Sequence, residues 1–250
     1  MEKYVFEGCC TSVADALKAR LAGAARVELC SRLEVGGVTP PLELIQDTLE
    51  VLNRTDFEEI SWLTKKLPYE TFKLNQLIDC KLTPKLNVLV RPRPADFVYD
   101  GNEVAQMISD IERVKNLKFS APSGRTVGVN GVVIGALLPD GRVDLSTMRR
   151  LVAAARPLEV TFHRAFDECA DVATGLEDVI SLGCERLLTS GHEADAFAGR
   201  FTLARLVGQA AGRIVILAGC GVRPHNIDEI ASVSHAPEYH SSTLEGWSFD

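Results

Sequence analysis

Two short β-rich segments each carry a glutamate and a cysteine that are two residues apart: Glu7 with Cys9, and Glu28 with Cys30. Side chains two apart on a strand point to the same face of the sheet, so each segment would direct one carboxylate and one thiol together. A helical stretch separates the segments, and a right-handed crossover would place them side by side in a parallel sheet. The four groups would then meet at the carboxyl ends of adjacent strands, where α/β proteins have their functional sites.

The two thiols predict a site for a soft metal ion. Thiolates favour Cu(I), zinc and iron–sulfur centres. Two of them suffice for Cu(I) of low coordination number but not for tetrahedral zinc. Cys10 is adjacent to Cys9 but would point to the opposite face of a regular strand. The alternative is that Cys9 and Cys30 are small buried core residues, because free cysteine packs as a hydrophobe and the sequence has no CxxC motif.

Two arginines end a third β-rich segment, Arg91 and Arg93 on either side of a proline. Guanidinium groups at a strand end can hold a carboxylate or a phosphate, and the alternative is a surface salt bridge for each. Two later loops consist of small residues whose backbone N–H groups could bind an anion. The alternative is that these loops are only tight turns. These loops contain Ser190, Gly191, Gly219 and Gly221.

A histidine and an aspartate follow another β-rich segment, His163 at its end and Asp167 four residues later. The aspartate is close enough along the chain to orient the imidazole. An oriented histidine near carboxylates can act as a general acid or base, with Glu7 or Glu28 as the second acid–base group. The alternative is a structural histidine whose hydrogen bonds are satisfied.

These residues need a scaffold that brings strand ends together. Eight strands are predicted, at residues 5–9, 27–30, 86–90, 129–134, 158–162, 186–189, 214–217 and 238–241. Amphipathic helices are predicted at residues 12–21, 42–52, 104–114, 145–152, 176–180 and 224–230. This alternation favours a (β/α)8 barrel of the TIM type, with an open doubly wound sheet as the fallback.

The chain length suits a single barrel domain over residues 1–250. Nine residues follow the last predicted strand, too few for a full closing helix. Two connections are longer than usual, residues 53–84 and 116–128. Each leads from a helix to a strand, so both insertions are expected on the amino-terminal face of the barrel, away from the site.

Composition argues against several classes of protein. A net charge of −7 does not suit a general binder of nucleic acid or of anionic membranes. No apolar run approaches the ~20 residues that span a bilayer, and the first residues lack the apolar core of a signal peptide. The seven cysteines are scattered and odd in number, which indicates reduced thiols in a cytoplasmic protein.

Taken together, the motifs resemble those of the CutC copper-homeostasis family. The resemblance runs in order from Tyr4 to Ser242, outside the two insertions. The motifs are Glu7 with Cys9, VELCS at 27–31, GGVTP at 36–40, VRPR at 90–93, DFVY at 96–99, GAL at 135–137, VTFHRAFD at 160–167, LTSG at 188–191, Gly219 with Gly221 and Val222, and YHSS at 239–242. Several of them are long and unusual, which makes the resemblance specific.

The resemblance implies a TIM-type barrel, often dimeric and in some members incomplete at the last helix, in a cytosolic protein linked to copper handling. It attributes Cu(I) binding to Cys9 and Cys30. Cys220 stands where the family usually has the middle glycine of a triplet and could add a third thiol, and Cys10 stands where a small aliphatic residue is usual. The stretch 53–84 has no evident counterpart in the family pattern.

Two functions therefore compete, with a scaffold protein as a third option. The leading hypothesis is a cytoplasmic copper-homeostasis protein, expected as a homodimer, whose partner is a copper ion bound by Cys9 and Cys30. The rival is a TIM-barrel enzyme of the lyase or isomerase type that acts on a small phosphorylated or carboxylated metabolite. In the rival hypothesis Arg91 and Arg93 hold the anion and His163 moves a proton; no dinucleotide-binding fingerprint suggests hydride transfer.

Overall fold

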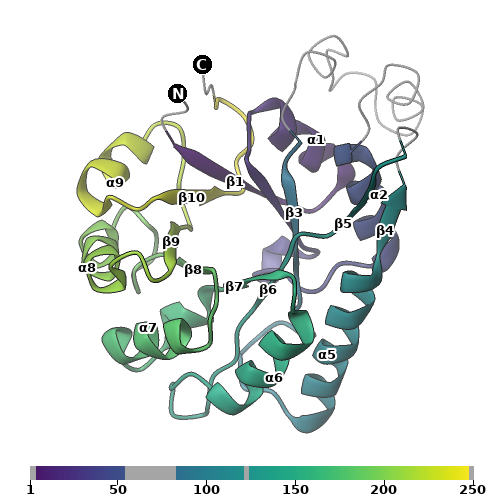
Figure 1. The fold of residues 1–250 in the computed structure, drawn as a ribbon. Coiled ribbons are helices and arrows are strands. Elements are labelled where there is room, and N and C mark those ends of the chain that lie inside the picture. The colour runs from purple at the N-terminus through teal and green to yellow at the C-terminus, as the bar shows by residue number, and fades with distance from the viewer. Residues whose placement is uncertain (1–3, 54–82, 121–123, 248–250) are drawn as a thin grey trace.

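The computed structural model describes residues 4–53, 83–120 and 124–247, which form a closed barrel of eight parallel strands (Figure 1). Around the barrel the strands follow chain order, and β10 pairs with β1 to close it. The strands are Val5–Cys10 (β1), Arg26–Leu29 (β2), Lys85–Leu89 (β3), Gly131–Ile134 (β6), Glu159–Phe162 (β7), Arg186–Thr189 (β8), Val215–Ala218 (β9) and Glu238–Ser241 (β10). The predicted barrel is confirmed, and the open sheet is wrong.

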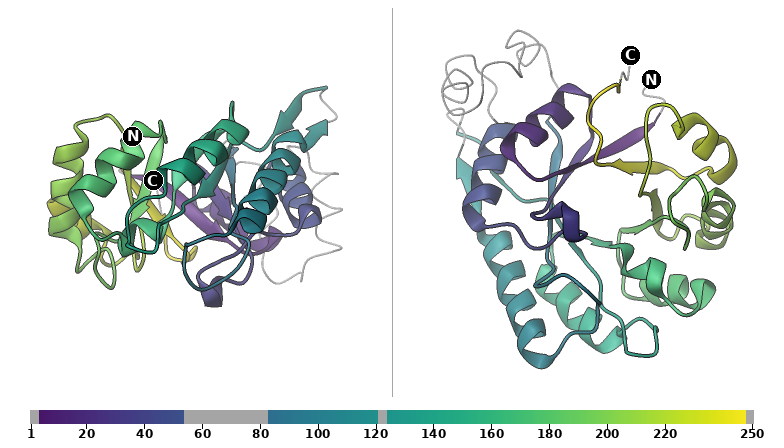
Figure 2. Two further views of the ribbon diagram at one scale, coloured as in Figure 1. Left: turned by 90° about the horizontal axis from the view of Figure 1, so that it is seen from below. Right: turned by 180° about the vertical axis from the view of Figure 1, so that it is seen from behind.

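Helices pack around the outside of the barrel (Figure 2). They are Val13–Leu21 (α1), Leu42–Asn53 (α2), Gly101–Asn116 (α5), Leu145–Ala155 (α6), Val172–Ser181 (α7), Arg200–Ala210 (α8) and Ile227–Ser234 (α9). The first begins as the sequence predicts, because the Ser12 side chain accepts a hydrogen bond from the Asp15 N–H at 3.1 Å. The sequence pattern does not indicate α8, since Phe201 on that helix is exposed and weakens its apolar periodicity.

The chain after β10 runs back over β1. The Trp247 ring stacks on Phe6 with centroids 4.6 Å apart, and Leu244 lies so close to Gly8 that a β-carbon there would be 3.0 Å from its methyl group. No helix follows β10 up to residue 247, where the described chain ends. A short apolar tail therefore covers the part of β1 that a closing helix would otherwise cover.

The described residues include most of the second long connection but little of the first. Helix α2 ends at Asn53 and β3 begins at Lys85, so nearly all of the predicted insertion at 53–84 lies outside the described residues. The second connection contains an antiparallel hairpin of Lys118–Ser120 (β4) and Thr126–Gly128 (β5). This hairpin lies against α2 and leads directly into β6, at the amino-terminal side of the barrel.

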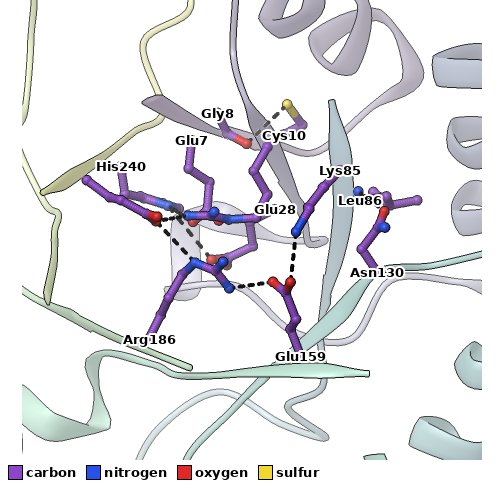
Figure 3. Close-up of polar contacts among 12 residues, drawn as sticks. Glu7, Gly8, Cys10, Glu28, Lys85, Leu86, Asn130, Glu159, Arg186 and His240 are labelled. Atoms are coloured by element: carbon purple, nitrogen blue, oxygen red, sulfur yellow. Dashed lines mark hydrogen bonds and ion pairs between the residues drawn. The ribbon is translucent and has the colours of Figure 1, made fainter. Parts of the chain in front are cut away.

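Charged side chains close the amino-terminal end of the barrel interior (Figure 3). They are the first residues of five strands: Arg26, Lys85, Glu159, Arg186 and Glu238. Arg186 donates to Glu159 at 2.7 Å and to Glu238 at 3.1 Å. Lys85 also binds Glu159 at 2.7 Å, and Arg26 binds Glu238 at 2.5 Å. Each of these groups has an oppositely charged partner, so this end of the barrel is a closed ion-pair network.

Candidate functional site

The carboxyl-terminal end of the barrel holds a pocket of about 700 Å³. Several residues predicted for the site line it: Cys9, Glu28, Cys30, Arg91, His163, Asp167 and Gly221. Others do not reach it: Glu7, Arg93, Ser190, Gly191 and Gly219. The strand ends therefore bring most, but not all, of the predicted site residues into one pocket.

Cys9 and Cys30 are in contact, with their Sγ atoms 3.9 Å apart. They come from neighbouring strands, since β1 pairs with β2 and Cys30 directly follows β2. Both side chains are buried, and they pack with Leu89 and Val133. The hydrogen bond to Cys30 and the burial together raise the pKa of Cys9 well above its ordinary value. The structure thus holds a pair of thiols in a mostly apolar corner of the pocket.

The other two notable cysteines lie elsewhere. The Cys10 thiol points away from the pocket, 3.6 Å from the carbonyl oxygen of Gly8, toward the helices that cover β1. Cys220 lines the pocket and donates to the carbonyl of Ala194 at 3.3 Å. Its φ of +70° lies in the left-handed region, a backbone conformation that glycine adopts more readily than cysteine.

Glu7 lies beneath the pocket and joins it to the ion-pair network. Its carboxylate accepts from Arg26 through one oxygen and lies 2.7 Å from His240 Nδ1 through the other. Burial would raise the pKa of Glu7, but Arg26 and His240 outweigh it and lower the pKa to about 2. Burial and Arg26 would lower the pKa of His240, but its hydrogen bond to Glu7 and the nearby charges of Glu28 and Glu7 outweigh them and raise it. Glu7 is therefore a fixed carboxylate with both oxygens engaged.

Glu28 is the contrasting carboxylate. Its side chain is buried and lines the pocket, with Oε2 lying 3.8 Å from His240 Nδ1, beyond hydrogen-bond distance. This oxygen has no hydrogen-bond partner among the described residues. Burial raises the pKa of Glu28 to about 7, since nothing compensates the desolvation as Arg26 does for Glu7. The two carboxylates predicted from one repeated motif thus have opposite environments.

His163 is a neutral imidazole with one unused donor. Its Nδ1 accepts from the Ala165 N–H at 3.1 Å, so the proton of the neutral ring is on Nε2. That Nε2 is buried with no hydrogen-bond partner in the described part of the chain. Burial and the nearby Arg91 lower the pKa of His163 to about 3. The predicted contact with Asp167 is not found, because that carboxylate is bound to the loop after β8 and to Arg164 instead.

Asp167 instead fills the backbone nest that follows β8. Its carboxylate accepts from the N–H groups of Ser190 at 3.1 Å and His192 at 3.3 Å, and from the hydroxyl of Thr189. Arg164 adds an ion pair at 2.9 Å. Of the N–H groups that the sequence offered to an external anion, that of Ser190 is therefore already bound to a carboxylate of the chain, and those of Gly191 and Gly219 are bound to Thr189.

The two predicted anion-binding arginines are separated. Arg91 is buried in the pocket wall, where it donates to the carbonyls of Val35, Gly37 and Ala95 and stacks on Phe97 at 4.7 Å. The Nε of Arg91 remains without a partner among the residues that the structure describes. Arg93 is turned away from the pocket and binds Glu103 at 2.5 Å and Asp96 at 2.9 Å. The structure thus does not form a two-arginine fork.

His240 and Arg26 take central positions that the sequence analysis did not assign. The signal for His240 was present, because Glu238 and His240 repeat on β10 the two-residue spacing of Glu7 and Cys9 on β1. The alternation places both side chains inside the barrel. Closure of the barrel then puts β10 next to β1, which brings His240 onto Glu7 across 233 positions of sequence.

Comparison with known proteins identifies the family. The model of the CutC family matches residues 4–60 and 73–245. The chain belongs to the CutC family. It is 42% identical to the family protein CutC of Histophilus somni over 236 residues, which are 94% of this chain and 81% of that protein. With the CutC protein of Xanthomonas axonopodis pv. citri the identity is 44% over 231 residues, 92% of this chain and 80% of the relative.

The family match also shortens the predicted insertion. It continues past Asn53 to residue 60 and resumes at residue 73, so the family model leaves only residues 61–72 of the stretch 53–84 unmatched. The hairpin of β4 and β5 lies entirely within the matched range, and is therefore part of the family pattern.

Solved structures agree with the fold. CutC from Streptococcus agalactiae, named for copper homeostasis, superposes with a TM-score of 0.73 at 25% identity, covering 96% of this chain and 99% of that one. A protein from Coccidioides immitis named as a deoxyribose-phosphate aldolase has a TM-score of 0.58 at 11% identity, over 96% of this chain and 81% of that chain, and shares the fold alone. None of the described helices is long and apolar enough to cross a membrane.

Proposed function

We propose that this CutC protein binds Cu(I) through Cys9 and Cys30 and serves copper homeostasis. The observation that carries the proposal is the 3.9 Å separation of the two buried sulfur atoms at the pocket. With metal–sulfur bonds of about 2.3 Å, this separation corresponds to a bent S–Cu–S angle of about 115°. A small movement apart would make the arrangement linear, so one ion fits between the sulfurs without rearrangement of the strands.

The surroundings of the pair suit a soft ion of single charge. Leu89 and Val133 supply no oxygen ligand, and a pair of thiolates selects Cu(I) over hard cations. Burial keeps water and oxidants away from the sulfurs. The high pKa of Cys9 means that copper must displace a proton from the pair, which is usual when a metal binds thiols.

Titration with Cu(I) in the absence of oxygen, against a chromophoric chelator, tests the proposal. We expect one Cu(I) per wild-type chain, and affinity reduced by roughly 100-fold or more in Cys9→Ser and in Cys30→Ser, because each removes one of two metal ligands. Cys220→Ser is the matched control, since this thiol lines the same pocket but bonds to a backbone carbonyl. Unchanged affinity in a Cys9→Ser/Cys30→Ser double variant would refute the proposal.

The rival enzyme hypothesis receives less support from the geometry. Arg93 lies outside the pocket lining, and Asp167 is bonded to the nest after β8 and not to His163. With its pKa lowered to about 3, His163 is a poor proton acceptor at neutral pH. The parts that an acid–base mechanism required are thus not assembled as expected. A cytoplasmic location and a homodimer stay predictions.

A further inference from the structure

We propose a second metal site in the same barrel, in which Glu7, Glu28 and His240 bind one divalent first-row transition-metal ion. One carboxylate oxygen from each glutamate and one ring nitrogen of His240 all lie within 4.8 Å of one another. The ligands come from three neighbouring strands, β1, β2 and β10, so the barrel itself fixes their positions (Figure 3). The site is independent of the thiol pair and of the copper proposal.

The distances need little adjustment for an ion to enter. His240 Nδ1 lies 2.7 Å from Glu7 Oε1 and 3.8 Å from Glu28 Oε2. Donors bound to one ion at about 2.1 Å each are roughly 3.0 to 3.5 Å apart. Shifts of less than about 1 Å would therefore convert the hydrogen bond between His240 and Glu7 into shared coordination. Glu28 and His240 line the pocket, which gives the ion a path of entry.

Glu28 supplies the observation that points to a ligand. Its side chain is buried, with only 5% of the residue exposed, and Oε2 faces His240 without any hydrogen bond within the described chain. A buried carboxylate oxygen without a donor is costly for a protein to maintain. A cation between Glu28, Glu7 and His240 would satisfy it.

The charge balance of the barrel interior favours a cation at this point. The connected network contains the carboxylates of Glu7, Glu28, Glu159 and Glu238. It contains the positive groups of Arg26, Arg186 and Lys85. The three permanent cations leave one carboxylate to be balanced either by a protonated His240 or, once that proton is displaced, by a bound cation. Arg26 is held by Glu7 Oε2 and by Glu238, so the opposite oxygen of Glu7 is left toward His240.

The donor set indicates the class of metal. Two carboxylates with one imidazole suit Zn²⁺, Fe²⁺, Mn²⁺ or Co²⁺, whereas a site for Mg²⁺ or Ca²⁺ would use oxygen ligands throughout. No thiol is within the group, so a soft monovalent ion has no advantage there. The pocket would then hold two chemically distinct sites, one of sulfur and one of oxygen and nitrogen.

Titration of reduced, metal-free full-length protein with Co²⁺ tests the site, since Co²⁺ reports its ligands by colour. We expect one Co²⁺ per chain with weak d–d absorption and no thiolate-to-metal charge-transfer band, and the same spectrum in the Cys9→Ser/Cys30→Ser variant. Glu28→Gln should weaken binding by roughly 100-fold or more, given that even outer-sphere partners of metals contribute 10–100-fold. Glu193→Gln, which alters an exposed carboxylate of the same pocket, should bind as wild type does.

An anomalous difference map from wild-type crystals soaked in Co²⁺ locates the ion without any variant, and should show a peak between Glu7, Glu28 and His240. Failure of the wild type to bind Co²⁺, a charge-transfer band that disappears with the cysteines, or full binding by Glu28→Gln would each overturn the proposal. The first would leave the cluster as an ion network only. Glu28→Gln retains both thiols, so it should still bind Cu(I) as wild type does. A variant that loses Co²⁺ but keeps Cu(I) is therefore altered only at the carboxylate–histidine site.

Discussion

Both ends of the barrel interior contain buried charged and polar side chains, but these groups are paired at one end and partly unpaired at the other. At the amino-terminal end, every charged group of the network has a partner of opposite charge within 3.1 Å. At the carboxyl-terminal end, Glu28 Oε2, Arg91 Nε and His163 Nε2 are buried without a hydrogen-bond partner in the described residues. Partnered charges of this kind hold a structure in one conformation, whereas a buried polar atom without a partner requires a separate explanation, for which we propose a bound ion at Glu28.

Glu7 and Glu28 show this difference at closest range. They occupy equivalent positions in the same Glu-x-Cys motif, yet the pKa of Glu7 is lowered to about 2 and that of Glu28 is raised to about 7. The cause is that Arg26 and His240 form hydrogen bonds to Glu7, whereas they act on Glu28 only from a greater distance and do not offset its burial. Glu7 thus joins the ion-pair network to the pocket, whereas Glu28 lines the pocket without a hydrogen bond to its Oε2 from the described residues.

The largest effect is expected at the amino-terminal end. Arg26→Met leaves the buried Glu7 and the half-buried Glu238 without their shared partner, and breaking a buried pair such as Arg26–Glu7 costs about 3–5 kcal/mol of unfolding free energy. Denaturant unfolding at neutral pH measures it. The control is Arg213→Ala, which removes an exposed ion pair with Glu177 and should cost far less, because solvent screens the pair. Equal losses in the two variants would contradict the distinction.

A smaller, pH-dependent effect is expected from His163. The unfolded chain protonates this histidine near pH 6.5 and the folded protein at about pH 3, so the unfolded state binds more protons between these values. Stability therefore falls as the pH is lowered through this window. The His163→Gln variant lacks this loss, and its unfolding free energy should rise relative to wild type by about 3 kcal/mol between pH 7 and pH 4. A difference that stays constant with pH would show that His163 titrates normally.

The smallest effect on stability is expected from Glu28→Gln. The variant keeps the shape of the side chain and removes a buried charge whose Oε2 has no donor within the described chain. Its unfolding free energy at pH 7 should stay within about 1 kcal/mol of wild type or exceed it, since most of what is lost is desolvation cost. Denaturant unfolding of Glu28→Gln and Arg26→Met under the same conditions compares the two losses of unfolding free energy. A loss as large as that of Arg26→Met would mean that Glu28 is structural, and the two ends would not differ.

Local sequence patterns were sufficient for the architecture and for part of the site. The alternation of strands and helices predicted the barrel, and the spacing of Cys9 and Cys30 at two strand ends predicted that the thiols meet. Arg93 and Asp167 show where this reasoning ends. Both lie in the connections that follow β3 and β7, and which neighbour each binds depends on the conformation of those connections, which no local pattern specifies.

What the sequence determined by itself is the periodicity: which side chains face inward, which segments are strands, and hence which end of the barrel gathers thiols, carboxylates and histidines. Tertiary structure alone decided the partners. Closure of the barrel brought His240 against Glu7, and strand register placed Arg26 beside Glu7 and not beside Glu28. The physical reason is that burial and electrostatic pairing depend on distances between residues far apart in the chain, whereas the direction of a side chain on a strand depends only on its immediate neighbours.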